Sequence, residues 1–406
     1  MSPSEPLTFQ RLVNAPAAEA FRAFTHATAL RDWLCNAAQT DPRPNGRVYL
    51  WWDDGYAAAG VYTKFEPGRR LIFGWSSPQE PGPLTVDVRF REKKGGVEVS
   101  VTHAGLGSGG KWKVSRASLQ AAWEAGLENL GSFLETGVDL RVARRPRLGI
   151  FIDEYSPVIA ERLGVPAKQG VRISGTADGS GAQAASLQKD DVLIALNGRK
   201  LTGPQSFGSA LQGLRAGDKP KLVFYRGAEK LSVPLELSSF PIPELPATGV
   251  ELAGRVRQLQ AEVDAAIAQA VDGLTEAQAE RRPADKEWNA KQLIAHFILS
   301  ERDYQAWVAD MLNDNVVNDF LEFRPNVDAR LDALVARLET TAALRLELTR
   351  AEAETAALLA ALPASFIQNR KHLYRRAAQW ALEVTAGHWH GEHAEQMQRT
   401  LAAARA

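Results

Sequence analysis

The strongest constraint on the fold is a change of residue pattern at a proline-rich stretch, Ser238 to Pro246. Before this stretch, short apolar runs alternate with Gly and Asp turns, which is typical of β-structure. After it, apolar residues recur every three or four positions over long segments, which indicates amphipathic helices. A proline-rich stretch is stiff and continues neither pattern. The sequence therefore predicts a β-rich part followed by a separate helical part.

Composition places the chain among ordinary globular proteins. Its 406 residues suggest roughly two to four domains. The 48 basic residues equal the 48 acidic residues, so no overall charge favours nucleic acid or an anionic membrane. No apolar run approaches the ~20 residues that would span a bilayer. There is one cysteine, Cys35, and the N-terminus lacks the basic start and apolar core of a signal peptide. We therefore expect a cytoplasmic protein.

Residues 1–139 have the pattern of a first module. Strands are expected at 7–14, 46–52, 60–65, 70–75, 84–90 and 96–103. In the last of these, Val97, Val99 and Val101 alternate with polar residues, as in a strand with one buried face. A short helix opens after Asn14, and a long helix with one apolar stripe is expected from Ser118 to Leu134. A curved antiparallel sheet around one long helix is the helix-grip plan.

This first module resembles the START-like (SRPBCC) family, which includes activators of a heat-shock chaperone's ATPase. The resemblance covers nearly the whole module. The residues that carry it are Asn14-Ala15-Pro16, Ala29-Leu30-Arg31-Asp32-Trp33, Asp41-Pro42-Arg43-Pro44-Asn45-Gly46, Val101-Thr102-His103-Ala104-Gly105-Leu106 and Trp123-Glu124-Ala125-Gly126-Leu127-Glu128-Asn129-Leu130. It implies a helix-grip fold and a protein-binding role, with a chaperone as one expected partner.

Aromatic residues in this module are candidates for the lining of an apolar ligand pocket. The candidates are Trp33, Trp51, Tyr62, Trp75 and Trp123. The competing interpretation is that they fill a small core, as large aromatic residues usually do. His103 lies at a strand end, where we expect a hydrogen-bonded structural histidine. No pairing of a nucleophile with a base is legible in this module, so we do not expect catalysis there.

Residues 140–238 form a second β-rich module, with Asn197-Gly198 as a strong hairpin signal. The order of its elements resembles PDZ domains of the bacterial type. The segments that carry the resemblance are Leu148-Gly149-Ile150-Phe151-Ile152, Gly170-Val171-Arg172-Ile173 and Asp190-Asp191-Val192-Leu193-Ile194-Ala195-Leu196-Asn197-Gly198. The resemblance implies a groove that holds the end of another chain as an added strand.

The predicted peptide site lies at the start of this second module. Gly149 lets the backbone approach closely, so that N–H groups of the loop can point at a terminal carboxylate. A helix from Pro204 to Leu214 would close the pocket for an apolar side chain. The candidate residues are Leu148, Gly149, Ile150, Phe151, Phe207 and Leu211. The competing interpretation is an occupied groove in which Leu148 and Ile150 are core residues. No Ser/His/Asp arrangement is legible, so we do not infer proteolysis.

Residues 239–406 are expected to form a bundle of four long helices. The predicted helices run from Val250 to Leu274, from Asn289 as cap to about Leu312, from Arg330 to Leu362 with a kink or break, and from Tyr374 to Ala404. The segments Glu287-Trp288-Asn289-Ala290-Lys291-Gln292-Leu293-Ile294-Ala295-His296 and His388-Trp389-His390-Gly391-Glu392-His393-Ala394-Glu395-Gln396-Met397 resemble the DinB family.

The DinB resemblance implies a divalent metal held by one histidine of the second helix and two of the last. His296 and His393 match two of these positions, but Trp389 stands where the remaining ligand is usual. His390, three residues before His393, shares its helix face and could substitute. Imidazoles suit zinc, nickel or iron. Some family members are thiol-dependent transferases, whereas a metal-free scaffold is the competing interpretation.

The fold class expected is multidomain α+β, with a helix-grip domain, a PDZ-like domain and a helical bundle. The leading hypothesis for function is a non-enzymatic binding protein that holds a peptide or protein C-terminus and, through the first module, a protein or apolar ligand. One alternative is a metal-dependent transferase or hydrolase that uses His296, His390 and His393. Another is a carrier of a hydrophobic small molecule. Self-association into a homodimer is compatible with each.

Overall fold

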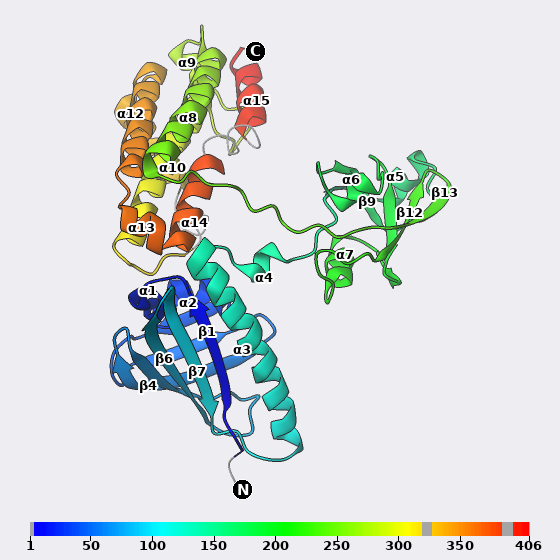
Figure 1. The fold of residues 1–406 in the computed structure, drawn as a ribbon. Helices are drawn as coiled ribbons and strands as arrows, with labels where there is room; N and C mark the ends of the chain where they lie inside the picture. The colour runs from blue at the N-terminus through cyan, green and yellow to red at the C-terminus, as the bar shows by residue number, and fades with distance from the viewer. Residues whose placement is uncertain (1–3, 319–326, 384–392, 406) are drawn as a thin grey trace. The chain divides into compact units, whose positions relative to one another are not determined.

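The computed structural model describes residues 4–318, 327–383 and 393–405 (Figure 1). The chain divides into two compact units. One unit combines residues 1–138 with residues 244–406, and the other consists of Asp139–Pro243. The segments before and after the middle unit therefore belong to the same structural unit, although about a hundred residues separate them in the sequence.

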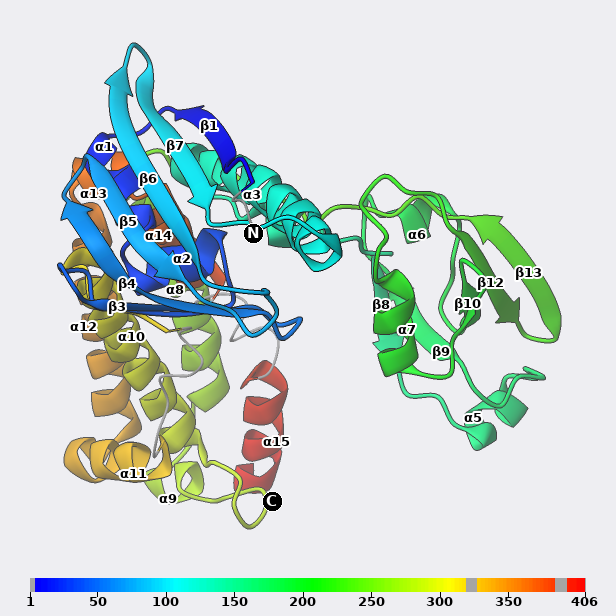
Figure 2. The same ribbon diagram turned by 90° about the horizontal axis from the view of Figure 1, so that it is seen from below.

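The N-terminal module is one antiparallel sheet of seven strands in the order β1-β7-β6-β5-β4-β3-β2. Figure 2 shows these strands beside the long helix α3, Gly110–Thr136. The strands are β1 (Leu7–Val13), β2 (Ala37–Thr40), β3 (Arg47–Trp51), β4 (Ala57–Glu66), β5 (Arg70–Trp75), β6 (Leu84–Lys93) and β7 (Gly96–Ala104). Two short helices, α1 (Ala17–Ala23) and α2 (Ala27–Trp33), lie between β1 and β2. The helix-grip plan expected from the sequence is thus observed.

The core of this module consists of the strand residues that point inward and the buried stripe of α3. In β7, Val97, Val99 and Val101 are fully buried, as their spacing predicts. They pack against the buried stripe of α3, which includes Trp123 and Leu130. Two predictions were wrong in detail. The strand β2 was not predicted, and α3 begins at Gly110 instead of Ser118. Its first turns place only Trp112 and Ser115 toward the core, so they carry no continuous apolar stripe.

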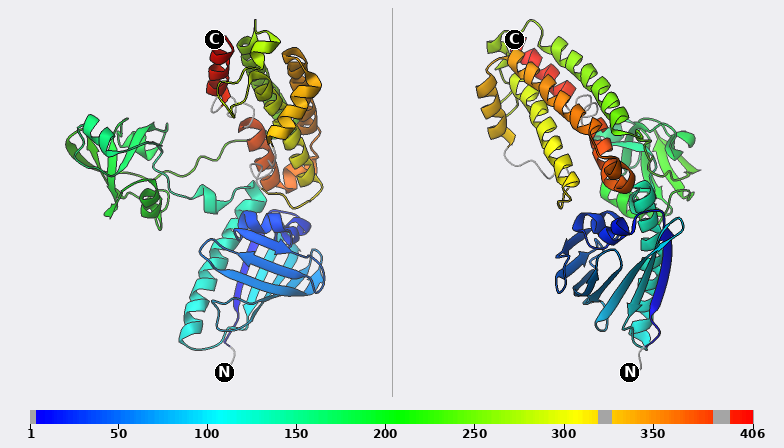
Figure 3. Two further views of the ribbon diagram at one scale, coloured as in Figure 1. Left: turned by 180° about the vertical axis from the view of Figure 1, so that it is seen from behind. Right: turned by 60° about the vertical axis from the view of Figure 1, so that its left-hand side comes forward.

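The C-terminal region is helical throughout its described residues. Its elements are α8 (Gly249–Val271), α9 (Glu276–Ala279), α10 (Ala290–Leu312), α11 (Val327–Leu338), α12 (Thr341–Ala360), α13 (Ala364–Asn369), α14 (Lys371–Leu382) and α15 (Ala394–Arg405). The helix α12 packs against both α8 and α10 (Figures 1 and 3). Asn289 caps α10 through a capping box with Gln292, as predicted. The predicted third helix is broken between α11 and α12.

The middle unit is built on a second antiparallel sheet, in the order β13-β12-β10-β9-β8. Its strands are β8 (Ile150–Asp153), β9 (Val171–Thr176), β10 (Val192–Leu196), β12 (Lys221–Arg226) and β13 (Glu229–Pro234), and the short β11 (Arg199–Lys200) pairs with β10. The helices α5 (Pro157–Arg162), α6 (Gly181–Ala184) and α7 (Pro204–Leu211) complete the unit. The strand β8 lies at one edge of the sheet and pairs with β9 alone.

Candidate functional site

The candidate peptide site begins at the loop that leads into β8. Gly149 has a φ of 79°, a left-handed conformation that glycine adopts without steric cost. A Cβ atom at this position would lie 2.1 Å from the Cβ of Ser180, so no larger residue fits without movement. Gly149 thus lies close against the side chain of Ser180, whereas its predicted role toward a peptide carboxylate stays a prediction.

The carbonyl groups of this loop are occupied, whereas its N–H groups are open. The Leu148 carbonyl accepts from the N–H of Ala182 at 3.0 Å, and the Gly149 carbonyl accepts from the N–H of Ala177 at 2.8 Å. The Ser180 hydroxyl donates to the same Gly149 carbonyl at 3.2 Å. Within the described residues, the N–H groups of Leu148 and Gly149 donate no hydrogen bond. Successive backbone donors that point at one place can bind an anion.

The side chains around β8 fall into two groups. The Leu148 side chain is 1% exposed and belongs to the core, together with Leu193 and Leu196. Phe151 is 57% exposed, and Ile152 is 43% exposed. A row of exposed apolar side chains on an edge strand is a surface on which another strand can pair. Leu148 therefore contributes its backbone to the candidate site, while the later residues of β8 contribute an edge.

Helix α7 carries the other predicted residues of this site. Phe207 and Leu211 are half-buried and pack against the same core cluster as Ile150 of β8. Figure 2 shows α7 and β8 on the same side of the middle unit. The predicted residues of the peptide site thus come from one loop, one edge strand and one helix that share a core.

Buried ion pairs stabilise the strand next to this edge. Arg172 of β9 is 10% exposed and contacts Asp190 at 2.8 Å and Asp153 of β8 at 3.1 Å. Asp191 is fully buried and receives two hydrogen bonds from Arg226, both at 2.8 Å. Charge-assisted pairs with two parallel bonds have a fixed geometry. Arg172 therefore links Asp153 of β8 to the turn at Asp190, beside the pair of Asp191 with Arg226.

Two of the three predicted metal ligands lie together in the helical region. The rings of His296, on α10, and His393, just before α15, have centroids 4.9 Å apart. Both side chains are buried, and Trp288 lies 4.9 Å from the His296 ring. The Nδ1 atom of His393 lies 2.8 Å from Oε1 of Gln396. The third predicted ligand, His390, lies outside the described residues.

The described residues supply two imidazoles and no further ligand for a metal at this place. Within residues 4–318, 327–383 and 393–405, no group of three His, Cys, Asp or Glu side chains could hold a metal ion. A protein zinc site normally has three or four protein ligands. The described donor set therefore fits a zinc, nickel or iron site only in part.

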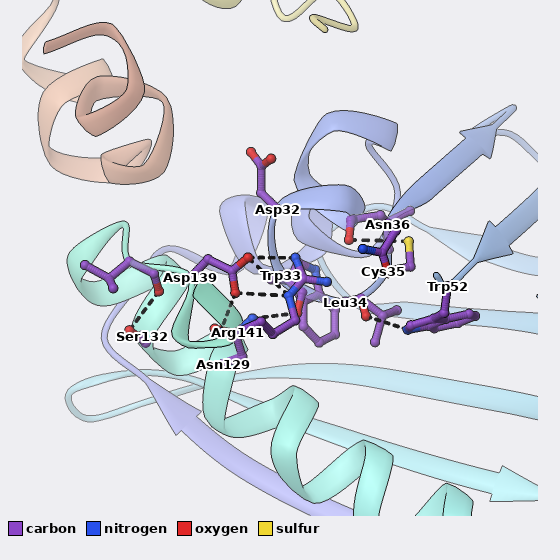
Figure 4. Close-up of polar contacts among 12 residues, drawn as sticks. Asp32, Trp33, Leu34, Cys35, Asn36, Trp52, Asn129, Ser132, Asp139 and Arg141 are labelled. Carbon is purple, nitrogen blue, oxygen red and sulfur yellow. Dashed lines mark hydrogen bonds and ion pairs between the residues drawn. The ribbon is translucent and has the colours of Figure 1, made fainter. Parts of the chain in front are cut away.

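The predicted pocket residues of the N-terminal module lie mostly in its core. Trp33, Tyr62, Trp75 and Trp123 are at most 3% exposed. Trp51 is half-buried and, by alternation along β3, faces away from the buried Leu50. Its neighbour Trp52 contacts Trp75 instead, with ring centroids 5.9 Å apart. Figure 4 shows the indole of Trp52 donating to the Leu34 carbonyl and Asn129 donating to the Trp33 carbonyl.

His103 is a buried, hydrogen-bonded histidine, as its position in the sequence predicts. Its Nδ1 atom accepts a hydrogen bond from the Trp123 indole at 3.0 Å. Burial lowers the pKa of His103 to about 4. The ring is therefore neutral near pH 7, which is the form that can accept from the indole. His103 is therefore a structural residue of the core.

A buried group of carboxyls in the helical region was missed by the sequence analysis. Glu301 on α10 accepts from the Thr355 hydroxyl at 2.5 Å and from Gln260 at 3.4 Å. Burial raises the pKa of Glu301. Burial, followed by the nearby charge of Asp264, raises the pKa of Glu352 to about 10. Charged residues on a helix usually face solvent, so nothing in the sequence pattern marks these as buried.

Comparisons with known proteins identify the modules on either side of the middle unit. Residues 14–135 match the family model described as "Activator of Hsp90 ATPase homolog 1-like protein". Residues 251–397 match the model described as "DinB superfamily". The chain therefore carries a START-like module of the activator-homologue type and a DinB-like module.

Curated relatives match a segment of the size of the middle unit. One, a "Probable periplasmic serine endoprotease DegP-like" of Rhizobium meliloti (strain 1021), is 30% identical over 105 residues, 25% of this chain and 21% of the relative. Another of the same description, from Pseudomonas fluorescens, is 28% identical over 109 residues, 26% of this chain and 23% of the relative. The chain thus spans about a fifth of the length of these relatives.

Solved structures also resemble part of the chain. Protein MLL2253 from Mesorhizobium loti is 17% identical, with a TM-score of 0.29, over 31% of this chain and 94% of that protein. CalU16 from Micromonospora echinospora is 24% identical, with a TM-score of 0.28, over 32% of this chain and 73% of that protein.

Among the described residues, no helix is both long enough and apolar enough to cross a membrane.

Proposed function

We propose that this protein is a cytoplasmic, non-enzymatic binding protein whose middle unit holds the C-terminal end of another polypeptide. The observation that carries the proposal is the pair of open N–H groups at Leu148 and Gly149 beside the free edge of β8. Buried backbone donors are almost always paired in proteins, so two open ones in sequence call for an acceptor from outside. A terminal carboxylate provides two acceptor oxygens.

The partner would add to the sheet as one more strand. Its carboxylate would accept from the Leu148 and Gly149 amides, and its backbone would pair with the open side of β8. Its last side chain would then lie toward α7, where Phe207 and Leu211 are half-buried and apolar. This arrangement favours a peptide that ends in an apolar residue. The similarity of a segment to DegP-like proteins is consistent with a PDZ-like unit.

For the N-terminal module we propose a protein ligand, with a chaperone as the first partner to test. The match to the family of ATPase-activator homologues supports this choice. The dense packing of Trp75 against Trp52, His103 and Trp123 supports a filled core over a cavity for an apolar molecule. A carrier role would instead predict a lipid or aromatic compound bound to the purified protein, which native mass spectrometry would detect.

A C-terminal peptide library panned against the full chain tests the peptide proposal. We expect enrichment of sequences that end in an apolar residue, and we expect the enrichment to disappear for the Gly149→Ala chain. The matched control is Gly175→Ala in β9, where a Cβ would lie 3.7 Å from Phe151 at ordinary contact distance. Absence of any enriched sequence, or equal enrichment by both variants, contradicts the proposal.

A second candidate function is a metal-dependent transferase or hydrolase in the helical region. The closeness of His296 and His393 and the match to the DinB superfamily favour it. These two imidazoles would hold a divalent metal, whose chemistry would be activation of a bound thiol or water. Metal analysis after supplementation tests this candidate. About one equivalent that is lost in the His296→Ala and His393→Ala variants supports it, and less than about a tenth of an equivalent contradicts it.

A further inference from the structure

A polar joint connects the N-terminal module to the helical region within their common unit. Asp314, in the turn after α10, accepts from Nε of Arg22 on α1 at 2.6 Å. The same carboxylate pairs with Arg370 at 3.3 Å, and its backbone carbonyl lies 2.8 Å from Nε2 of His26. One acidic residue of the helical region therefore gathers three basic side chains, two of which come from the N-terminal module.

Further contacts extend this joint along α14 and the turn after α10. Arg376 forms an ion pair with Asp32. Nζ of Lys371 donates to the Glu135 carbonyl at 2.6 Å. The N–H of Val317 donates to the hydroxyl of Thr28 at 3.1 Å. These hydrogen bonds and ion pairs come from three elements of the N-terminal module, namely α1, α2 and α3 with their adjoining turns.

Gly137 shows how closely the two surfaces meet. It ends α3 in the left-handed conformation, with a φ of 73°. A Cβ atom at this position would lie 2.5 Å from the carbonyl of Lys371 and 2.7 Å from the N atom of His372. A backbone approach of this kind requires a residue without a side chain. The end of α3 and the start of α14 thus fit each other at backbone distance.

His372 lies at the centre of the joint with no hydrogen-bond partner. Its side chain is buried, and its ring centroid lies 4.0 Å from that of Phe133 on α3. Among the described residues, neither Nδ1 nor Nε2 of His372 has a partner. The imidazole therefore packs as an uncharged ring between the two modules. A buried histidine without any acceptor is costly to protonate.

The groups that face His372 make a proton on this ring still more unfavourable. The charged and titratable groups of the joint are Glu19, Arg22, His26, Arg31 and Asp32 from α1, α2 and their connection, Glu135 from α3, Asp314 from the turn after α10, and Arg370, Lys371, Arg375 and Arg376 from α13 and α14. Burial first, and then the charges of Arg22, Arg376 and Arg370, hold the pKa of His372 well below its ordinary value.

We propose that this joint is an acid-sensitive latch, closed at neutral pH to make one body of the two modules and opened when His372 takes up a proton. Opening would free the ring for solvation and would separate it from Arg22 and Arg376. A group whose pKa is lower in the closed state than in the open one favours opening as pH falls. Each pH unit below about 6.5 then shifts the equilibrium roughly tenfold toward the open state, until the lowered pKa is reached.

Two other groups of the joint, His26 and Asp314, also take up protons on acidification. Burial lowers the pKa of His26, so its protonation also opposes the closed state. Burial raises the pKa of Asp314, but the hydrogen bond and charge of Arg22 outweigh this effect and lower it overall. Asp314 therefore keeps its charge until the solution is more acidic. The first event on acidification is thus expected at the histidines.

Distances between spin labels on the full chain test the latch. Labels at Thr8→Cys and Ala353→Cys, in a Cys35→Ala background, report the two modules at exposed positions. We expect a narrow distance distribution at pH 7.5 and a broad one at pH 4.5. His372→Phe keeps a ring against Phe133 but cannot be protonated, so its distribution should broaden much less at pH 4.5 than that of the unsubstituted chain. Asp314→Lys opposes Arg22 and Arg370 and should be broad at both.

Circular dichroism at both pH values serves as the folding control for every variant. A distribution that is broad in the unsubstituted chain at pH 7.5 overturns the proposal, and so does one that stays narrow at pH 4.5. Equal broadening of His372→Phe and the unsubstituted chain at pH 4.5 removes the role of His372. If His372→Phe does not fold, a narrow distribution for Asp314→Lys at pH 7.5 is still sufficient to overturn the latch.

Discussion

The β8 edge of the middle unit and the histidine pair of the helical region are opposite kinds of candidate site. At the edge, Leu148 and Gly149 carry N–H groups without a partner in the described part of the chain, next to β8, the last strand in the sheet order. At the pair, His296 and His393 are 5% and 6% exposed and lie beside Trp288. The edge has two backbone donors without a partner among the described residues, whereas the two histidine rings are packed against each other and against aromatic neighbours.

This difference indicates which of the two sites can bind a ligand with less rearrangement of the protein. A partner strand at β8 would gain hydrogen bonds without any rearrangement of the core. A metal between the histidines would need at least one more ligand and a path from solvent. In the helical region, burial raises the pKa of Glu301 and of Glu352, which favours the neutral form of each carboxyl. This contrast supports the proposal of peptide binding at the edge over the proposal of a metal at the histidine pair.

The largest effect is expected from Gly149→Ala, which should weaken peptide binding at the β8 edge. The substitution places a Cβ against Ser180 and forces a left-handed φ on a residue with a side chain. Strain and overpacking would cost about 2–4 kcal/mol in the described conformation, so we expect the free loop to leave it. A peptide that requires this conformation would then bind roughly 30-fold or more weakly. Calorimetric titration of a selected peptide measures the loss. Retained affinity, with Gly175→Ala as control, would show that the loop does not bind the carboxylate.

The next largest effect is expected in the helical region, from Glu352→Gln. The pKa of Glu352 is raised to about 10 from an ordinary 4.5, so the folded state holds a proton that the unfolded state releases. The stability that this proton gives is present below about pH 4.5 and is lost as pH rises toward 10. A glutamine needs no proton, so we expect a gain of about 1–3 kcal/mol at pH 7.

Urea unfolding at pH 5 and pH 8 measures this effect. The unsubstituted chain should lose stability between the two values, and the Glu352→Gln chain should show a smaller loss. Glu354→Gln is the matched control, because Glu354 lies on the same helix and is exposed. If Glu352→Gln is destabilising at both pH values, the carboxyl is charged in the folded protein and the assignment of a packing role fails.

A smaller effect at the edge is expected from Phe207→Ala. Phe207 is half-buried against the core of the middle unit and would contact the last side chain of a bound peptide. The loss of about half of a phenylalanine's buried surface corresponds to roughly 1 kcal/mol, or about fivefold in affinity. Val158→Ala, at a 76% exposed position on α5, is the control. Equal affinities for the two variants would place the side-chain pocket elsewhere.

The smallest effect is expected from His296→Ala on peptide binding. The two sites share no residue, so the dissociation constant should stay within about twofold. The same preparation gives the metal content, which separates the transferase alternative from the binding proposal. A much larger change in peptide affinity would show that the histidine pair and the β8 edge are coupled, and the comparison between them would have to be withdrawn.

Local patterns predicted much of the fold. The alternation in β7, the Asn289 cap of α10 and the Asn197-Gly198 hairpin were readable because each depends on residues close in sequence. The strand β2 was missed because Ala37–Thr40 is short and only partly buried. Trp51 and Trp52 differ in the face they occupy because neighbouring side chains of a strand point to opposite faces.

The candidate site was predictable in part for a similar physical reason. The φ of Gly149 follows from a local glycine signal, but the open N–H groups depend on the Ala177–Ala182 loop, which lies far along the chain. The joint around His372 pairs residues that are more than two hundred positions apart. No periodicity reports such contacts. The peptide-site and metal-site residues themselves stay predictions until binding is measured.

The most direct test of the peptide proposal compares one peptide with a free C-terminus and the same peptide with a C-terminal amide. Calorimetric titration of the full chain with each peptide measures both affinities. Because a charged carboxylate would accept from the Leu148 and Gly149 amides, the account predicts at least about tenfold weaker binding of the amide. Equal affinities would contradict it, since the two open donors would then play no part in recognition.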